Sequence, residues 1–257
     1  MKSSHVEINA AACVGCGLCR RVCPAHNIAL ERGRARALSD GCIMCGQCSA
    51  VCPQRAISIE GFGSGQAERP DELRLAPEDV LNVIRFRRSV RCFRQTPVPG
   101  EIIEQILEAG RLSHTARNAQ DVSFTVLIDE RARLEAMAVK LFRAVKPAAN
   151  LFSAMARRNE IDEHFFFFNA PAVIVISARE KVNGVLAAQN MEFVAEAYGL
   201  GVLYSGFFTA AANASRRIRK ALAVPRGKTV AMTLVLGYPD VRYLRSTPHR
   251  ELDVRYM

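Results

Sequence analysis

The 257-residue chain contains no tryptophan and no long apolar run. No stretch approaches the roughly 18 consecutive apolar residues of a membrane-spanning helix, so we expect no membrane partner. Residues 1–12 lack a basic segment followed by an apolar one, and no secretory signal is predicted. We therefore expect a cytoplasmic protein of a reducing compartment, where cysteines bind metals more often than they form disulfides.

The sequence also lacks the signs of a nucleic-acid-binding protein. Its net charge is +10, but the basic residues are not interleaved with aromatic ones on one element, and no binding motif is visible. No nucleic-acid partner is expected. The positive charge indicates either a solvated basic surface or sites for phosphate-bearing cofactors and acidic redox partners.

Cysteine, in contrast, is abundant and regularly spaced. Eight of the nine cysteines form two copies of the run C-x2-C-x2-C-x3-C-P, which lie 29 residues apart. This run is typical of two-cluster bacterial ferredoxins, in which three cysteines wrap one 4Fe–4S cluster and the fourth ligates the other. Zinc sites usually pair cysteines across a longer gap, which disfavours zinc. The predicted ligands are Cys13, Cys16, Cys19 and Cys52 for one cluster, and Cys42, Cys45, Cys48 and Cys23 for the other.

The composition along the chain predicts two domains. Residues 1–60 form the expected two-cluster, ferredoxin-like domain. Residues 61–77 are rich in glycine, proline and charge and lack apolar periodicity, as in a linker. Residues 78–257 form the larger domain.

The larger domain is predicted to be an α+β sandwich. Its expected strands are continuously apolar, so helices must cover both faces of a central sheet. The run Phe165–Phe168 cannot point one way on a helix or a strand, so some of these rings should face a pocket or a partner chain. Helices are expected over Ala76–Ile84, Pro99–Leu112, Ala132–Val145, Asn183–Tyr198 and Ser215–Ala223, and strands over Phe124–Asp129, Pro171–Ala178, Val202–Tyr204 and Val230–Gly237.

Several short motifs in this domain occur together in a known order. They are Arg87-Arg88-Ser89-Val90-Arg91, the loop with Asn118 and Gln120, Gln189-Asn190, Gly199-Leu200-Gly201, Leu236-Gly237-Tyr238-Pro239 and a basic tail that ends at Arg250. Together they resemble the FMN-dependent nitroreductase family over about residues 78–257. Together with the cysteine-rich residues 1–60, the whole chain resembles ferredoxin–nitroreductase fusions. The resemblance implies FMN at a homodimer interface, with both chains contributing to each site.

The candidate FMN contacts follow from the chemistry of the cofactor and from this resemblance. A flavin phosphate is a dianion that requires guanidiniums and hydroxyls. Asn118 and Gln120 could hold polar edges of a flavin or a substrate, or could equally be turn residues. The resemblance implies that backbone N–H groups at Ser205-Gly206 point at flavin N5. The candidates for the phosphate are Arg87, Arg88, Ser89 and Arg91, joined by His249 and Arg250 from the tail.

The sequence departs from many relatives at three places. Asp121-Val122 stands where they carry a proline and an aromatic residue, and His114 stands where many carry proline. The segment between Val145 and Phe168 looks too short for an element that covers the substrate. His114 and the ninth cysteine, Cys92, are more simply explained as structural residues.

The predicted function is that of an FMN-dependent oxidoreductase. It reduces small acceptors, such as nitro compounds or quinones, with electrons relayed through two 4Fe–4S clusters from a ferredoxin-like donor or supplied by NAD(P)H. We expect no dedicated catalytic side chain, since the difficult chemistry belongs to the cofactor. Two alternatives stay open: an electron carrier without acceptor chemistry of its own, and specialised reductive chemistry on the same scaffold.

Overall fold

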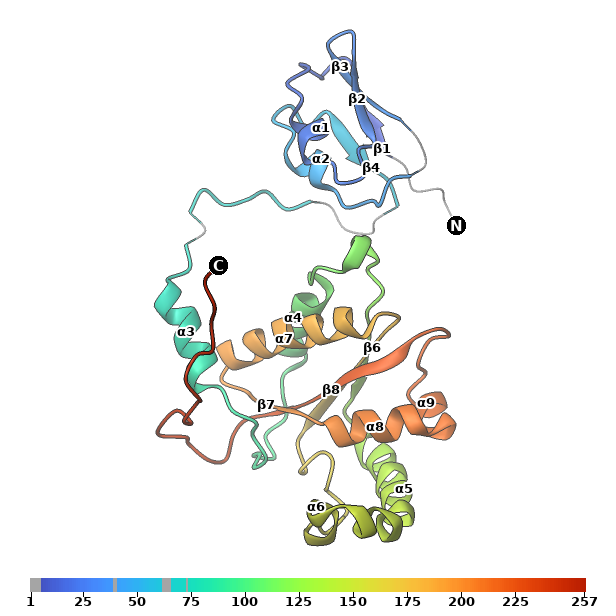
Figure 1. Ribbon diagram of the computed structural model, residues 1–257, viewed down its shortest axis with the longest axis vertical. Coiled ribbons are helices and arrows are strands. Elements are labelled where there is room, and N and C mark those ends of the chain that lie inside the picture. Colours follow the sequence, from blue (N-terminus) through green and yellow to red (C-terminus); the bar gives the residue numbers. More distant parts are fainter. Residues whose placement is uncertain (1–5, 39–40, 62–65, 73) are drawn as a thin grey trace. The chain divides into compact units, whose positions relative to one another are not determined.

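The computed structural model describes residues 6–38, 41–61, 66–72 and 74–257. The chain forms two compact units (Figure 1), of which the first comprises Met1–Arg74 and Thr115–Ala119 and the second Leu75–His114 and Gln120–Met257. Of the predicted linker, residues 62–65 and 73 lie outside the described residues, and the described part before Pro77 contains neither helix nor strand.

The first unit is built from two halves of similar design. Each half has a cysteine loop that ends in a left-handed glycine, Gly17 (φ 78°) or Gly46 (φ 77°), and continues into a short helix. Glycine adopts this conformation without a Cβ penalty, so both loops can turn tightly. The helices are α1 (Leu18–Val22) and α2 (Gln47–Ala50), and the antiparallel strand pairs are β1 (Val6–Ile8) with β4 (Ile57–Ile59) and β2 (Ile28–Glu31) with β3 (Arg34–Ala37).

A four-stranded antiparallel sheet forms the centre of the second unit. All seven residues of the central strand β6 are buried. Val173 and Val175 pack into one core cluster, whereas Ala172, Ile174 and Ile176 pack into the other, as the two-residue period of a strand requires. The prediction that both faces are covered is confirmed. In spatial order the strands are β5 (Ser123–Leu127), β6 (Ala172–Ala178), β8 (Thr229–Gly237) and β7 (Gly201–Tyr204).

Helices cover both faces of this sheet (Figure 1). Helices α4 and α7 bury apolar side chains against one face, and α5, α8 and α9 against the other. The result is the predicted α+β sandwich. The helices are α3 (Pro77–Phe86), α4 (Gly100–Arg111), α5 (Arg131–Phe152), α6 (Ala154–Arg158), α7 (Lys181–Ala197), α8 (Gly206–Ala214) and α9 (Arg216–Ala221), with one 3-10 turn at Ala116–Asn118.

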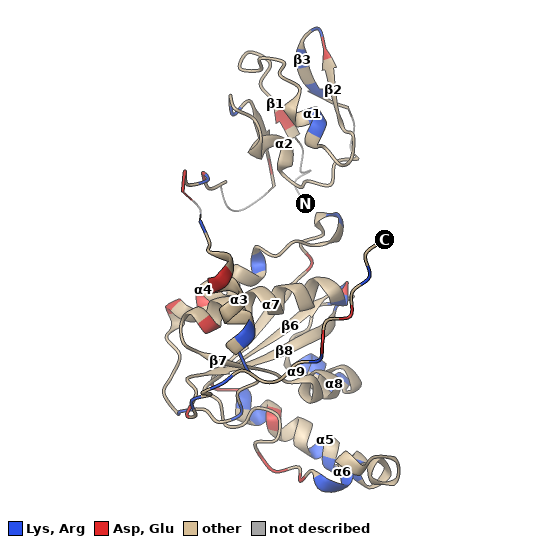
Figure 2. Ribbon diagram, turned by 60° about the vertical axis from the view of Figure 1, so that its left-hand side comes forward, with Lys and Arg blue, Asp and Glu red and all other residues tan. Residues whose placement is uncertain are grey.

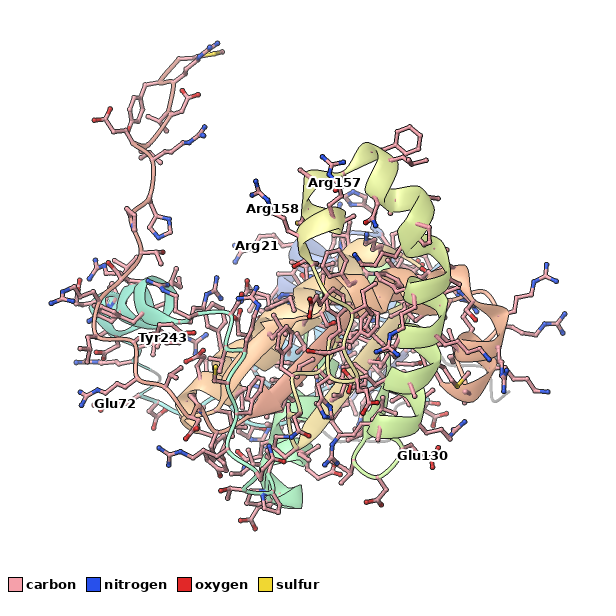
Figure 3. All side chains as sticks on the ribbon, turned by 90° about the horizontal axis from the view of Figure 1, so that it is seen from below. Arg21, Glu72, Glu130, Arg157, Arg158 and Tyr243 are labelled. Carbon is pink, nitrogen blue, oxygen red and sulfur yellow. The ribbon has the colours of Figure 1, made fainter. Side chains whose placement is uncertain are left out.

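Two helical segments differ from the sequence prediction. Helix α5 was expected to end at Val145 but continues through Pro147 to Phe152. Helix α6 follows and is capped by Ser153, whose hydroxyl accepts a hydrogen bond from the Ala156 N–H at 3.2 Å. Figure 3 shows helices α5 and α6, with Glu130 labelled at the start of α5 and Arg157 and Arg158 on α6. The segment that looked short therefore holds a helical element of its own.

Helix α8 was not predicted. Its sequence, GFFTAAANA, is apolar on nearly every side and lacks the amphipathic pattern that marks a surface helix. Burial of Phe208, Ala211 and Ala212 against the sheet accounts for that composition.

Across the described part of the chain, no helix combines the length and the apolar character needed to cross a membrane.

Candidate functional site

The arginine-rich segment after α3 runs along the edge of strand β7. The Val90 N–H donates to the Val202 carbonyl at 3.0 Å, and Ser89 forms a parallel bridge with Val202. Val90 is buried and anchors the segment. Ser89 and Arg91 are exposed on either side of it, and Arg87 and Arg88 are half-buried.

Arg87 belongs to a buried polar network centred on Glu192 of helix α7. Its guanidinium lies 2.8 Å from the Glu192 carboxylate and stacks over the Phe193 ring, 5.1 Å from the ring centroid. The same carboxylate oxygen accepts hydrogen bonds from Gln189 Nε2 at 2.8 Å and from the Tyr204 hydroxyl at 3.0 Å. The network thus ties the arginine segment, α7 and β7 together and fixes the position of Arg87.

The electrostatics of this network perturb two neighbouring groups. Burial, reinforced by the Glu192 charge and opposed by Arg87, raises the pKa of Glu196 to about 7. Burial also raises the pKa of the Tyr204 hydroxyl, and the Glu192 charge adds to that shift. Tyr204 therefore stays protonated and donates to Glu192. No local sequence pattern indicates Glu192, Glu196 or Tyr204, because their roles depend on contacts between distant elements.

Arg88 carries buried donors without acceptors. Its Nη1 donates to the Arg87 carbonyl, but Nε and Nη2 are buried and find no hydrogen-bond partner among the described residues. A buried cationic donor left unpaired is costly, and a bound anion or water would supply the acceptors that it lacks. This observation fits a phosphate-bearing cofactor.

An open pocket with an empty volume of about 1680 Å³ lies where β7 meets α8. Ser205 is fixed beneath it, since its N–H donates to the Thr233 carbonyl at 2.9 Å and its hydroxyl donates to the Phe166 carbonyl at 3.0 Å. Gly206 begins α8 and is exposed, and a Cβ there would meet no atom within 4 Å. The first N–H groups of a helix have no partner within the helix and form the positive end of its dipole, so the start of α8 suits an electron-rich ligand. The lining residues include Arg91, Tyr204, Ser205, Gly206, Phe165 and Phe168.

Four further candidates are not among these lining residues. Asn118 is in the first unit, where its amide donates to the Met44 carbonyl at 2.7 Å and the Ile43 carbonyl at 3.3 Å. Gln120 adopts a left-handed conformation (φ 43°) at the start of the next segment. His249 and Arg250 are exposed on an irregular C-terminal tail, whose beginning near Tyr243 passes α3 in Figures 1 and 3. Their roles stay predictions.

Asp121, which replaces the proline of many relatives, has a structural role. Its carboxylate accepts hydrogen bonds from the Arg179 and Glu180 N–H groups, at 2.8 and 3.0 Å, and from Asn183 Nδ2 at 2.7 Å. Burial disfavours the charged form, but these three donors outweigh it and hold the pKa of Asp121 below its ordinary value. The residue anchors the start of α7 and, next to it in the chain, Gln120.

Four cysteines of the first unit lie around one cavity, and the full assignment of the eight ligands stays a prediction. Cys13, Cys16, Cys19 and Cys52 line one cavity with an empty volume of about 360 Å³. Within the described ranges, no three His, Cys, Asp or Glu side chains are placed to hold a single metal ion. Backbone N–H groups point at sulfur, from Ala35 to Cys13 and from Ala56 to Cys52, both at 3.3 Å. Such N–H groups stabilise a thiolate, and those of Ala35 and Gly15 lower the pKa of Cys13.

Comparison with protein families defines the class of both parts. The nitroreductase family model matches residues 84–238, and the 4Fe-4S dicluster domain model matches residues 5–54. The chain belongs to the nitroreductase family. It is an oxidoreductase of that family with an N-terminal dicluster domain, as the motifs predicted.

Individual relatives are distant. A protein of Methanothermobacter thermautotrophicus, whose name proposes NADH dehydrogenase or NAD(P)H nitroreductase activity, is 26% identical over 175 residues, which cover 65% of this chain and 80% of that protein. An NADPH-dependent oxidoreductase of Staphylococcus saprophyticus is 26% identical over 172 residues, 63% of this chain and 66% of its own length.

Solved structures share the fold of the larger unit. A nitroreductase with bound FMN from Bacteroides fragilis aligns with a TM-score of 0.58 at 21% identity, covering 70% of this chain and 98% of that one. Oxidised iodotyrosine deiodinase bound to FMN and 3-iodo-L-tyrosine aligns with a TM-score of 0.55 at 19% identity, covering 69% of this chain and 98% of that one. At these identities the likeness defines the fold and leaves the substrate open.

Proposed function

We propose that the larger unit binds FMN and that the chain reduces small acceptors with electrons that pass through two 4Fe–4S clusters. The observation that carries this proposal is the pair of buried nitrogens of Arg88 that find no hydrogen-bond partner among the described residues. Arg88 belongs to the same short segment as Arg91, which lines the pocket together with Ser205 and Gly206. An FMN phosphate would supply the acceptors that Arg88 lacks. The FMN held by the fold relatives supports the same assignment.

The chain's own residues would bind and orient the cofactor. FMN, when bound, supplies one- and two-electron redox chemistry. Arg88 and Arg91 hold its phosphate, with Ser89 and the tail residues His249 and Arg250 as further candidates. Arg87, fixed by Glu192, keeps its charge at a constant position. Gly206 leaves its side of the pocket open, so that backbone N–H groups can approach the ring.

The cluster ligands are proposed as a crossed set. Cys52 lies with the first three cysteines around one cavity, and by the internal repeat Cys23 joins Cys42, Cys45 and Cys48. We further propose a homodimer, a ferredoxin-like or NAD(P)H donor, and nitro compounds or quinones as acceptors, all in the cytoplasm. The proposed domain bounds are 1–60, 61–77 and 78–257.

The flavin assignment is tested by comparing FMN with riboflavin, which lacks the phosphate. In the Arg88→Gln variant we expect FMN affinity to fall about 10- to 100-fold, since a hydrogen bond to a charged group contributes about 1.5–3 kcal/mol, while riboflavin affinity stays unchanged. Titration of the flavin-free protein, followed by flavin fluorescence, measures both. Arg216→Gln, at an exposed arginine that starts α9, is the matched control.

The possible outcomes separate the assignments. An equal loss of FMN and riboflavin affinity in Arg88→Gln would mean that Arg88 supports the fold and does not bind phosphate. Turnover of a nitroarene or a quinone by the FMN-loaded wild type separates an enzyme from an electron carrier. A carrier would accept electrons reversibly and leave those compounds unreduced.

A further inference from the structure

Basic residues surround the first cysteine loop. Helix α1 carries Arg20 and Arg21, both exposed. The turn between β2 and β3 carries Arg32, and Arg34 begins β3. This turn lies directly against the same loop, since a Cβ added to Gly15 would lie 2.0 Å from the Gly33 carbonyl oxygen. Figure 2 shows blue segments on α1 and β3, whereas β2 carries no lysine or arginine.

These charges are largely unbalanced. Glu31 is paired with Arg36 at 2.6 Å. Among the described residues, no carboxylate forms an ion pair with Arg20, Arg21, Arg32 or Arg34. The face therefore presents a positive field beside Cys16, which is exposed.

The internal repeat provides a built-in comparison. A shift of 29 residues maps Cys16 onto Cys45 but maps Arg20 and Arg21 onto Ser49 and Ala50. Helix α2 carries no charged residue, and the Ser49 hydroxyl points inward to the Ile57 carbonyl at 2.8 Å. In the second cysteine loop, Cys45 is less exposed than Cys16, and the Met44 carbonyl accepts a hydrogen bond from the Asn118 amide. The helix after the first cysteine loop thus carries two exposed arginines, whereas the helix after the second loop carries no charge.

We propose that this face, defined by Arg20, Arg21, Arg32 and Arg34, docks an acidic one-electron carrier protein, and that electrons enter at the cluster of the Cys13–Cys19 loop. The inference rests on the proposed electron relay and adds the donor's charge and its point of entry. Complementary charge steers two proteins together and orients them, and an exposed cluster edge shortens the path for the electron. In each encounter the carrier loses one electron and the cluster gains one, with no bond made or broken.

Charge reversal on α1 tests the proposal. We compare the double variant Arg20→Glu/Arg21→Glu with a matched control, Arg216→Glu/Arg217→Glu, an exposed adjacent arginine pair at the start of α9 that changes the net charge equally. The probe is a reduced acidic two-cluster ferredoxin. Rapid-freeze EPR of the reduced clusters gives the second-order rate constant at several salt concentrations, and calorimetry gives the dissociation constant of the complex.

We expect the α1 variant to lose at least about tenfold in rate constant at low salt and most of the salt dependence, with a weaker complex, while the α9 control keeps both. Dithionite, a small anionic reductant, should reduce the clusters of all three proteins alike at high salt, where its attraction to charged side chains is screened. An equal loss in both variants, no loss in either, or slower reduction by dithionite at high salt in the α1 variant would overturn the proposal. So would loss of binding to anionic phospholipid vesicles with an unchanged ferredoxin rate. Because the readout is cluster reduction, failure of FMN binding would not alter it.

Discussion

Replacement of Asp121 by alanine should loosen the start of helix α7 without unfolding the unit. The change removes one carboxylate that accepts three hydrogen bonds and leaves the Arg179 and Glu180 N–H groups and the Asn183 amide without that partner. Each hydrogen bond to a charged group contributes about 1.5–3 kcal/mol, but water can enter a helix terminus and replace part of this. We therefore expect a local loss of about 3 kcal/mol, or about 100-fold in amide protection.

Hydrogen exchange followed by mass spectrometry measures this loss. The peptide that spans residues 176–186 should exchange about 100-fold faster in Asp121→Ala, while the peptide of strand β8 should keep its rate. Asp129→Ala, which removes an exposed carboxylate nearby in the chain, is the control and should change neither peptide. Unchanged exchange at 176–186, or equal acceleration of β8, would refute the anchoring role.

Two further predictions concern helices α7 and α4. The raised pKa of Glu196, about 7 in the folded state, means that the folded state binds more protons than the unfolded one between about pH 4.5 and 7, so stability should fall as pH rises through that window. Glu196→Gln should abolish this fall in stability and stabilise the protein above pH 7 by up to about 3 kcal/mol. The measurement is the melting temperature of both proteins as a function of pH, and the same pH dependence in both would contradict the prediction. In Gly110→Ala, the new Cβ would lie 2.7 Å from the Phe124 ring and 2.8 Å from the Met191 sulfur. The overpacked Cβ should cost about 1–3 kcal/mol of stability and lower the melting temperature. In the control Gly100→Ala, the new Cβ meets nothing within 4 Å and should not lower it. An equal loss of melting temperature in both variants would rule out overpacking.

The sequence predicted most of what depends on local pattern. Continuous apolar runs located β6 and β8 to within one residue at each end, and the doubled cysteine spacing identified the dicluster domain. The motif order from Arg87 to Pro239 identified the family of the larger unit. These features share a cause: each is encoded in residues close in the chain or in a fixed spacing.

Features that depend on distant contacts were not predictable. Asn118 lies in a loop between α4 and β5, yet its hydrogen bonds go to Ile43 and Met44. In the sequence Glu192 looks like any polar residue of a helix. Only in the folded chain do Arg87 and Tyr204 contact it, from 105 and 12 residues away. The periodicity of apolar residues in the sequence does not indicate such partners, because only the packing of the sheet and its helices brings them together.

The phenylalanine run illustrates how one distant residue decides an ambiguous segment. Glu135 of α5 is buried, and its carboxylate accepts the N–H groups of Phe166 and Phe167 at 2.9 and 2.7 Å. Held there, the chain reverses through left-handed conformations at Phe168 (φ 51°) and Asn169 (φ 57°), which are rare for a bulky side chain. Phe166 and Phe167 therefore enter the core, whereas Phe165 and Phe168 line the pocket beside Gly206. Strain of this kind persists only where the surroundings over-determine the backbone, and it concentrates at functional sites. A single carboxylate, about thirty residues earlier in the chain, thus divides four identical side chains between the core and the candidate flavin pocket.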